Sequence, residues 1–181
     1  MAQTDFKTDI TKEESDFLKS YLNKNSVVLE WGSGWSTVEY SALVKEYYSI
    51  EHDFGWYEDV KERIGKNARI YFVPPNTTGI KFKSYINFAG VLGSLGKKFD
   101  IVFIDGRSRL ECAIEALKYL NAKSVVFIHD FCRPYYWDVI KHYRIAGIVG
   151  NMVALEKGNF SASEKDRYFL IKKYLTLPEN G

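Results

Sequence analysis

The chain has 181 residues, of which 46% are hydrophobic and 27% charged, a composition typical of a globular domain. Its 25 basic and 23 acidic residues leave a net charge of +2 without a polybasic block, which argues against a nucleic-acid partner. Two cysteines are too few for a disulfide framework and favour a reducing compartment. The polar N-terminus is unlike a signal peptide, and no apolar run is long enough for membrane insertion. We therefore expect a cytoplasmic protein with a single domain over residues 1–181; the sequence leaves open whether that domain belongs to a longer chain.

Helical and extended patterns alternate along the chain. A capping box at 11–14 predicts a helix that continues to Leu22. Further helices are expected at 36–44 (capped by Ser36 or Thr37), 56–64, 83–95 (weakened by two glycines), 110–120 and 137–143. Strands are expected at 26–30, 46–50, 68–73, 99–104 and 124–128, with closing strands at 145–149, 152–155 and 168–171 around a polar loop at 159–165. This alternation predicts a parallel sheet with helices on both faces.

Polar residues follow four of the predicted strands. In open α/β sheets, ligands bind beyond the carboxyl ends of the strands, so these positions are candidates for a site. They are Glu30, Gly32, Ser33 and Gly34 after the first strand, Glu51, His52 and Asp53 after the second, Asp105, Gly106 and Arg107 after the fourth, and His129 and Asp130 after the fifth. Polar residues after strands are common, which would explain one or two of these ends but not all four together with the glycine spacing.

The glycine turn at 32–34 predicts a loop that approaches a ligand with its backbone. A dinucleotide-binding loop would have a third glycine where this chain has Thr37, so that fingerprint is incomplete. The carboxylate of Glu30 suits a cationic ligand better than a pyrophosphate. S-adenosylmethionine carries a sulfonium and an ammonium group, and an acidic loop favours both.

Four segments together resemble class I S-adenosylmethionine-dependent methyltransferases. The segment Glu30-Trp31-Gly32-Ser33-Gly34 is similar to their first motif, and Glu51 matches the acidic residue that binds the ribose hydroxyls. Residues 99–105 and 126–130 are similar to the ends of their fourth and fifth strands, and the resemblance covers about residues 10–175. It implies a Rossmann-like, doubly wound, mostly parallel seven-stranded sheet with an antiparallel closing strand. It also implies that the cofactor is held by Glu30, Trp31, Gly32, Ser33, Gly34, Ser36, Thr37, Glu51, His52 and Asp105. Trp35 departs from the glycine-rich pattern, and either covers the cofactor pocket or packs on the neighbouring helix.

Asp105, His129 and Asp130 are the candidate catalytic residues. Asp105 could accept a proton from an acceptor hydroxyl, ligate Mg²⁺ or another divalent cation together with Asp130, or cap the following helix. His129 is either a base with a pKa near neutrality or a buried histidine with satisfied hydrogen bonds. His52 is expected in the cofactor pocket or on an exposed loop.

Three arginines and two tyrosines are the candidate acceptor-binding residues. Arg107 and Arg109 could bind a phosphate or carboxylate, and Arg107 could instead pair with a local carboxylate. Arg133, Tyr135 and Tyr136 follow the fifth strand, where aromatic rings suit a sugar or merely pack the loop. The sequence thus predicts an O-methyltransferase acting on a sugar, such as a deoxysugar of a glycan, or on another small molecule. The alternatives are an aminopropyl transferase of the same fold and a non-catalytic cofactor-binding module or partner subunit. The oligomeric state is left open.

Overall fold

The computed structural model describes residues 9–158 and 171. The strands are β1 (Val27–Trp31), β2 (Glu46–Glu51), β3 (Ala68–Phe72), β4 (Phe99–Ile104), β5 (Leu120–Ile128), β6 (Tyr143–Val149) and β7 (Met152–Lys157). The helices are α1 (Lys12–Lys19), α2 (Trp35–Ser41), α3 (Phe54–Lys61), α4 (Lys83–Asn87), α5 (Ala89–Ser94) and α6 (Arg109–Ala116), with 3₁₀ helices η1 (Leu117–Tyr119) and η2 (Pro134–Lys141).

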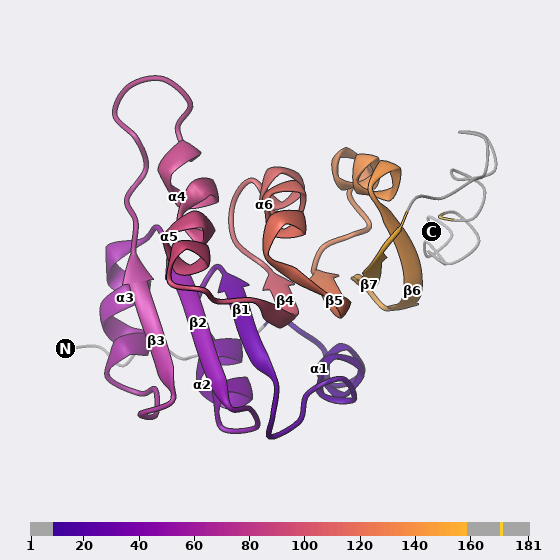
Figure 1. Cartoon of the computed structure of the whole chain (residues 1–181), viewed down its shortest axis with the longest axis horizontal. Coiled ribbons are helices and arrows are strands. Elements are labelled where there is room, and N and C mark those ends of the chain that lie inside the picture. Colours follow the sequence, from indigo (N-terminus) through magenta and orange to yellow (C-terminus); the bar gives the residue numbers. More distant parts are fainter. Residues whose placement is uncertain (1–8, 159–170, 172–181) are drawn as a thin grey trace, which may run out of the picture.

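The seven strands form one sheet in the order β3-β2-β1-β4-β5-β7-β6 (Figure 1). Strands β1 to β5 are parallel, and β7 runs antiparallel to both of its neighbours, β5 and β6. The strand order reverses at β1, because β2 and β3 lie on one side of it and β4 and β5 on the other. The expected Rossmann-like, doubly wound sheet with an antiparallel closing strand is confirmed. Its carboxyl edge at the reversal point is where ligands bind in such folds.

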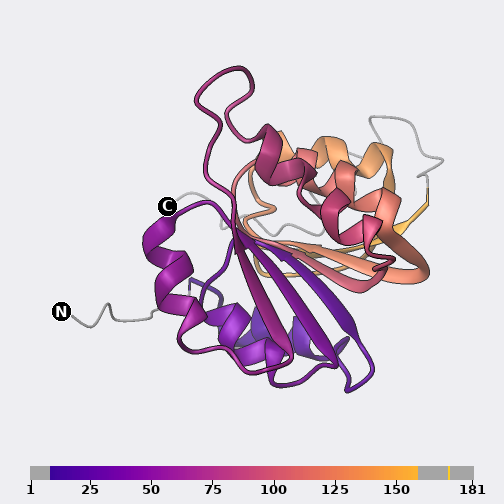
Figure 2. The same cartoon turned by 60° about the vertical axis from the view of Figure 1, so that its left-hand side comes forward.

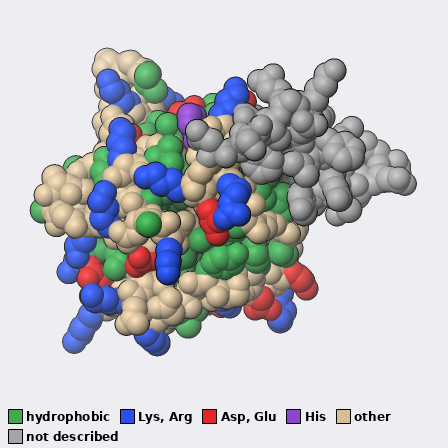
Figure 3. Space-filling model, turned by 45° about the vertical axis from the view of Figure 1, so that its right-hand side comes forward, with side chains coloured by type: hydrophobic (Ala, Val, Ile, Leu, Met, Phe, Trp, Pro, Cys, Tyr) green, Lys and Arg blue, Asp and Glu red, His purple; other side chains and the backbone are tan. Residues whose placement is uncertain are grey.

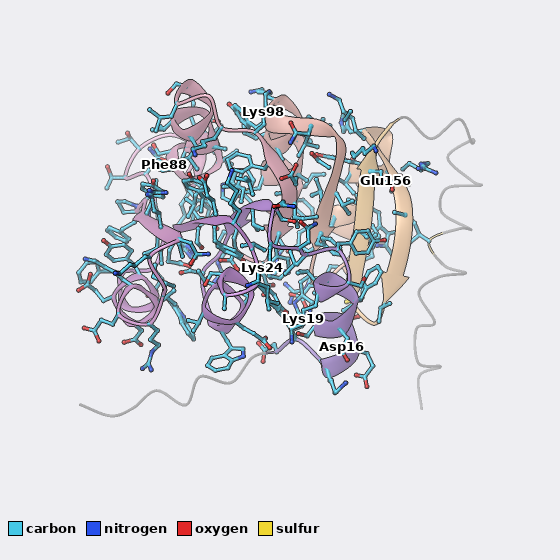
Figure 4. All side chains as sticks on the ribbon, turned by 60° about the horizontal axis from the view of Figure 1, so that its bottom comes forward. Asp16, Lys19, Lys24, Phe88, Lys98 and Glu156 are labelled. Atoms are coloured by element: carbon cyan, nitrogen blue, oxygen red, sulfur yellow. The ribbon has the colours of Figure 1, made fainter. Side chains whose placement is uncertain are left out.

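Helices cover both faces of the sheet. Helices α1, α2 and α3 lie on one face, whereas α4, α5, α6 and η2 lie on the other (Figure 2). Asp16 and Lys19 on α1 and Phe88 beside α5 accordingly lie on opposite sides of the sheet (Figure 4). Alternate strand residues enter two separate cores: Leu29 and Trp31 of β1 pack beneath α4 to α6, and Val28 packs beneath α1 and α2. The two cores hold the strands rigidly, and therefore also the loops at their carboxyl ends.

Several predicted boundaries differ from the observed elements. Helix α2 begins at Trp35 with Gly34 as its cap, so the predicted capping by Ser36 or Thr37 is wrong. The predicted helix 83–95 is two short helices that meet at Phe88, and the predicted helix 137–143 is the 3₁₀ helix η2, after which Tyr143 begins β6. Strand β5 begins four residues before the expected 124–128.

The predicted closing elements are only partly visible. Strands β6 and β7 are joined by a tight turn at Gly150 and Asn151, and the polar loop expected at 159–165 lies outside the described residues. Of the predicted strand 168–171, only Ile171 is described, and it is buried with a helical backbone. Within the described residues, no helix has the length and apolar character that crossing a bilayer requires.

The charged side chains on the face seen in Figure 3 are of mixed sign. Lysine and arginine side chains lie among aspartate and glutamate side chains and do not form a continuous basic surface there. A protein that tracks a nucleic-acid backbone usually presents a basic stripe. This face has no such stripe.

Candidate active site

A cleft of about 460 Å³ opens at the carboxyl ends of β1, β2, β4 and β5. This volume is within the range of small-molecule sites. Eleven of the predicted site residues line it: Gly32, Ser33, Gly34, Ser36, Glu51, His52, Asp105, Arg107, Arg109, Asp130 and Arg133. The other six, Glu30, Trp31, Thr37, His129, Tyr135 and Tyr136, do not line it. The strand-end argument therefore identifies one contiguous site.

The floor of the cleft is a close contact between the loops after β1 and β4. Gly32 has a φ of +93°, and a Cβ at this position would lie 2.4 Å from the backbone nitrogen of Gly106. A Cβ at Gly106 would in turn lie 2.1 Å from the hydroxyl oxygen of Tyr85. The backbone N–H groups of Asp105 and Gly106 both donate to the carbonyl oxygen of Trp31, at 2.9 and 2.8 Å. Glycine is required at both positions because the two backbones touch.

Gly34 is in a different situation from Gly32, although it belongs to the same turn. Its φ of −178° is extended, and a Cβ built on it meets nothing within 4 Å. Packing inside the protein therefore does not require a glycine here. Because Gly34 lines the cleft, the missing side chain leaves room for a ligand beside the backbone.

Glu30 is fully buried beneath this loop. Its carboxylate accepts hydrogen bonds from the hydroxyls of Ser36 (2.6 Å), Thr37 (2.5 Å) and Ser49 (2.7 Å). Burial raises the pKa of Glu30 to about 7, although these hydroxyls partly oppose the rise. The expected direct contact of Glu30 with a cationic ligand is thus corrected: the carboxylate binds the first turn of α2 to β2 and so positions the loop. Trp31 is likewise buried, and its indole N–H donates to the carbonyl oxygen of Tyr85 (3.0 Å).

Glu51 lies at the end of β2 with both carboxylate oxygens occupied. One oxygen accepts from the backbone N–H and the hydroxyl of Ser33 (2.6 and 2.8 Å), and the other from the N–H groups of His52 and Asp53 (2.7 and 2.8 Å). Burial alone would raise the pKa of Glu51, but His52 and these donors lower it below its ordinary value. The side chain is therefore an ionised carboxylate at the cleft wall, and the Ser33 hydroxyl is a donor to it that can rotate away.

His52 extends the same wall. Its Nδ1 lies 2.9 Å from Glu51 Oε1, and its ring meets Phe82 and Tyr85 edge-on, each with ring centres 5.4 Å apart. Trp35 and Trp56 also line the cleft, with exposed fractions of 42% and 41%. Of the two alternatives for Trp35, the structure shows the one at the pocket. Together these rings give the β1–β2 half of the cleft flat apolar surfaces beside one carboxylate.

Asp105, at the end of β4, is held by Arg109 and His129. Arg109 Nη1 and His129 Nδ1 lie 3.0 and 3.1 Å from Asp105 Oδ1. The other ring nitrogen of His129 lies 3.5 Å from Glu14, a carboxylate only 1% exposed. Burial would lower the pKa of His129, but Asp105, Glu14 and Asp130 raise it above the ordinary histidine value. Helix α6 is capped at Ser108, so Asp105 is not its capping residue.

Arg109 joins the two aspartates that the sequence places at strand ends. Its Nη2 lies 3.1 Å from Asp130 Oδ2, while Nη1 reaches Asp105 and the carbonyl oxygen of His129 (2.5 Å). Arg109 is 8% exposed, and its Nε donates to the carbonyl oxygen of Gly106 (3.0 Å). A cation of the protein thus already lies between Asp105 and Asp130. Among the described residues, no group of three or more His, Cys, Asp or Glu side chains could hold a metal ion. The donor set does not fit the expected Mg²⁺ site.

The predicted acceptor-binding residues separate into three groups. Arg107 and Arg133 are exposed and line the cleft, whereas Arg109 is buried in the network just described. The Tyr135 hydroxyl donates to Glu111 (2.9 Å) outside the cleft. The Tyr136 ring lies 5.7 Å from the Arg109 guanidinium carbon, on which it packs. The two tyrosines therefore support the loop after β5 and do not face the cleft.

Glu14 is the functional candidate that the sequence did not reveal. It completes the capping box of α1 by accepting from the N–H of Thr11 (2.8 Å), and it also accepts from the N–H of Asn151 in the β6–β7 turn (2.6 Å). Burial would raise the pKa of Glu14, but these donors and His129 lower it. The capping box explains the residue locally, so no signal in the sequence pointed to its second role beside His129.

The sequence and the structure were compared with known proteins, and only solved structures match. No protein-family model matches the sequence, and no curated protein matches it. A methyltransferase-like protein from Silicibacter pomeroyi is similar in structure, with a TM-score of 0.69 and 22% identity over 93% of this chain and 96% of that one. MycE methyltransferase, solved with Mg, SAH and mycinamycin VI, matches with a TM-score of 0.55 and 15% identity over 80% of this chain and 45% of that one. An rRNA methylase from Streptococcus thermophilus matches with a TM-score of 0.52 and 14% identity over 78% of this chain and 92% of that one.

These likenesses establish the fold and no more. All of the identities are below 25%, and a protein described as precorrin 8w decarboxylase shares the architecture with a TM-score of 0.55. The Rossmann-like fold that the four motifs imply is confirmed. The activity and the acceptor depend on the site itself.

Proposed function

We propose that this protein is an S-adenosylmethionine-dependent methyltransferase and that the cleft at the carboxyl ends of β1, β2, β4 and β5 binds the cofactor and the acceptor. The observation that carries the proposal is the turn at Gly32 to Gly34 beside Glu51. The turn exposes its backbone to the cleft, and the space beside Gly34 contains no protein atom within 4 Å of a built Cβ. Glu51 contributes an ionised carboxylate at the end of the adjoining strand. A backbone cradle and a carboxylate suit a ligand with a cationic amino-acid part and a ribose diol.

In this proposal the β1–β2 half of the cleft holds the cofactor. Gly32, Ser33 and Gly34 bind its methionine part, and Glu51 binds the ribose hydroxyls after the Ser33 hydroxyl turns aside. His52 and the nearby aromatic rings provide the apolar wall. Glu30 does not contact the cofactor but positions the loop that does, because it accepts hydrogen bonds from Ser36 and Thr37. The cofactor supplies an electrophilic methyl group on a sulfonium, which becomes a neutral thioether on transfer.

The β4–β5 half holds the acceptor, for which we propose a hydroxyl of a sugar or another small molecule. Asp105 takes the hydroxyl proton as the new carbon–oxygen bond forms, and its side chain is 27% exposed. Arg109 and His129 fix the position of the Asp105 carboxylate. Alignment of the acceptor with the methyl group is then the main catalytic contribution of the protein. The reaction needs no metal at Asp105 and Asp130, since Arg109 already compensates their charge.

Calorimetric titration with S-adenosylhomocysteine and S-adenosylmethionine tests the cofactor half. We expect both to bind the wild-type protein, and Gly34→Val to reduce the affinity at least tenfold because its side chain enters the ligand space. The change should leave thermal stability nearly intact, since a Cβ there meets no protein atom within 4 Å. Glu39→Gln, on α2 outside the cleft where Glu39 pairs with Lys19 of α1, is the control and should bind as wild type. An absence of binding at high micromolar cofactor would refute the proposal.

A radiolabel screen of sugar and catechol acceptors tests the transfer step. Asp105→Asn should abolish methyl transfer while cofactor affinity is retained. Near-normal turnover would exclude Asp105 as the base. Cofactor binding without transfer to any hydroxyl acceptor would instead favour a non-catalytic binding module.

A further inference from the structure

The two halves of the cleft differ in charge. The walls after β1 and β2 contain Glu51 and neither lysine nor arginine. The loops after β4 and β5 contribute three arginines and two aspartates to the lining, and Asp9, from the segment before α1, adds a third carboxylate. A cationic cofactor beside Glu51 and an anionic ligand beside the arginines would each meet side chains of opposite charge.

The three arginines of the cleft differ in their ion-pair partners. Arg109 forms ion pairs with Asp105 and Asp130. Arg133 Nη2 lies 3.0 Å from Asp130 Oδ2, and 61% of the Arg133 side chain is exposed. Arg107 forms no ion pair with any described residue, although it is exposed at the cleft and only two residues after Asp105. Arg107 is therefore the arginine of the cleft whose guanidinium forms no ion pair with a carboxylate of the described residues.

We propose that the acceptor carries an anionic group, a carboxylate or a phosphate, and that Arg107 binds this group at the mouth of the cleft with Arg133 in support. The identification of the ligand as an acceptor rests on the proposed function, but the anion site itself does not. A guanidinium offers a planar pair of donors that matches both anions. An anion bound there holds the rest of the molecule beside Asp105, where a hydroxyl can lose its proton. The acceptor class is then an acidic sugar or a phosphorylated small molecule.

The test measures anion binding to protein loaded with S-adenosylhomocysteine, at low ionic strength, by calorimetry. The probes are inorganic phosphate and the matched set glucose, glucuronate and glucose 6-phosphate. We expect the three anions to bind at least roughly fivefold more tightly than glucose, a difference of about 1 kcal/mol. Arg107→Gln should remove most of this preference, and Arg107→Lys should keep part of it. Arg144→Gln, on β6 away from the cleft, should leave it unchanged.

Each outcome decides the matter. Equal affinity for glucose and glucuronate, no anion binding to the wild type, or unchanged binding in Arg107→Gln would overturn the proposal. The stronger of glucuronate and glucose 6-phosphate identifies the anion. If S-adenosylhomocysteine itself fails to bind, the proposed function falls, and the same titration on unliganded protein still tests Arg107.

Discussion

The two halves of the cleft are built from different interactions. After β1 and β2, buried carboxylates are held by hydroxyls and backbone N–H groups: Glu30 by three hydroxyls, and Glu51 by Ser33 and two N–H groups. After β4 and β5, the carboxylates of Asp105 and Asp130 are held by charged partners, chiefly Arg109. Neutral donors leave the first half negative for a cationic ligand. Guanidinium groups hold the carboxylates of the second half in place, and Arg107 is left without an ion-pair partner among the described residues.

Gly32→Ala should produce the largest effect, because the β1 loop depends on backbone contact. The new Cβ would lie 2.4 Å from the Gly106 nitrogen at a φ of +93°. We expect a loss of about 4 kcal/mol or more in unfolding free energy, equivalent to a fall of roughly 10 °C in Tm. Differential scanning calorimetry measures it. Gly34→Ala in the same turn is the control and should stay within about 1 kcal/mol of wild type. Similar losses in both variants would contradict the distinction between a glycine required by the fold and one that leaves ligand space.

The difference between the two halves of the cleft also explains which features the sequence could predict. The cofactor loop was found because its signal is local: glycines, an acidic strand end and a polar helix start lie within a few residues. The sheet followed from alternation, which depends on the periodicity of each segment alone. The contact of Arg109 with His129 and that of Glu14 with Asn151 were missed because their partners are distant, at 20 and 137 positions along the chain. An ion-pair network is set by tertiary packing, and no pattern within one segment records it.

Arg109→Met should have the next largest effect, in the acceptor half. Methionine keeps much of the apolar stem but leaves Asp105 and Asp130 without their shared cation. We expect about 3–5 kcal/mol of destabilisation, the usual result of breaking a buried ion pair by removing one partner. Chemical denaturation would measure it. Millimolar Mg²⁺ should raise the Tm of this variant and not that of the wild type. A wild-type Tm that rises with Mg²⁺ and falls with EDTA would show that the protein binds the metal after all. It would contradict the claim that Arg109 takes the place of a metal between Asp105 and Asp130.

Glu30→Gln should have a smaller, pH-dependent effect in the cofactor half. Burial raises the pKa of Glu30 from 4.5 to about 7, so the folded state favours the protonated carboxyl. Its contribution to stability is complete below about pH 4.5 and is lost as the pH rises through about 7, a change of up to about 3 kcal/mol. Glutamine does not titrate. The stability of the variant relative to wild type should therefore increase from pH 5 to pH 8, as measured by urea unfolding midpoints. A constant difference across this range would mean that Glu30 is not held by burial as described.

Tyr135→Phe should have the smallest effect and tests the boundary of the acceptor half. The ring is 64% exposed, and its hydroxyl donates to Glu111 outside the cleft. Loss of such an exposed hydrogen bond should cost less than about 0.5 kcal/mol. Anion binding by cofactor-loaded protein should also be unchanged, whereas Arg107→Gln should reduce it. If Tyr135→Phe weakens anion binding as much as Arg107→Gln does, the loop after β5 faces the acceptor, and the charge contrast would no longer account for acceptor recognition.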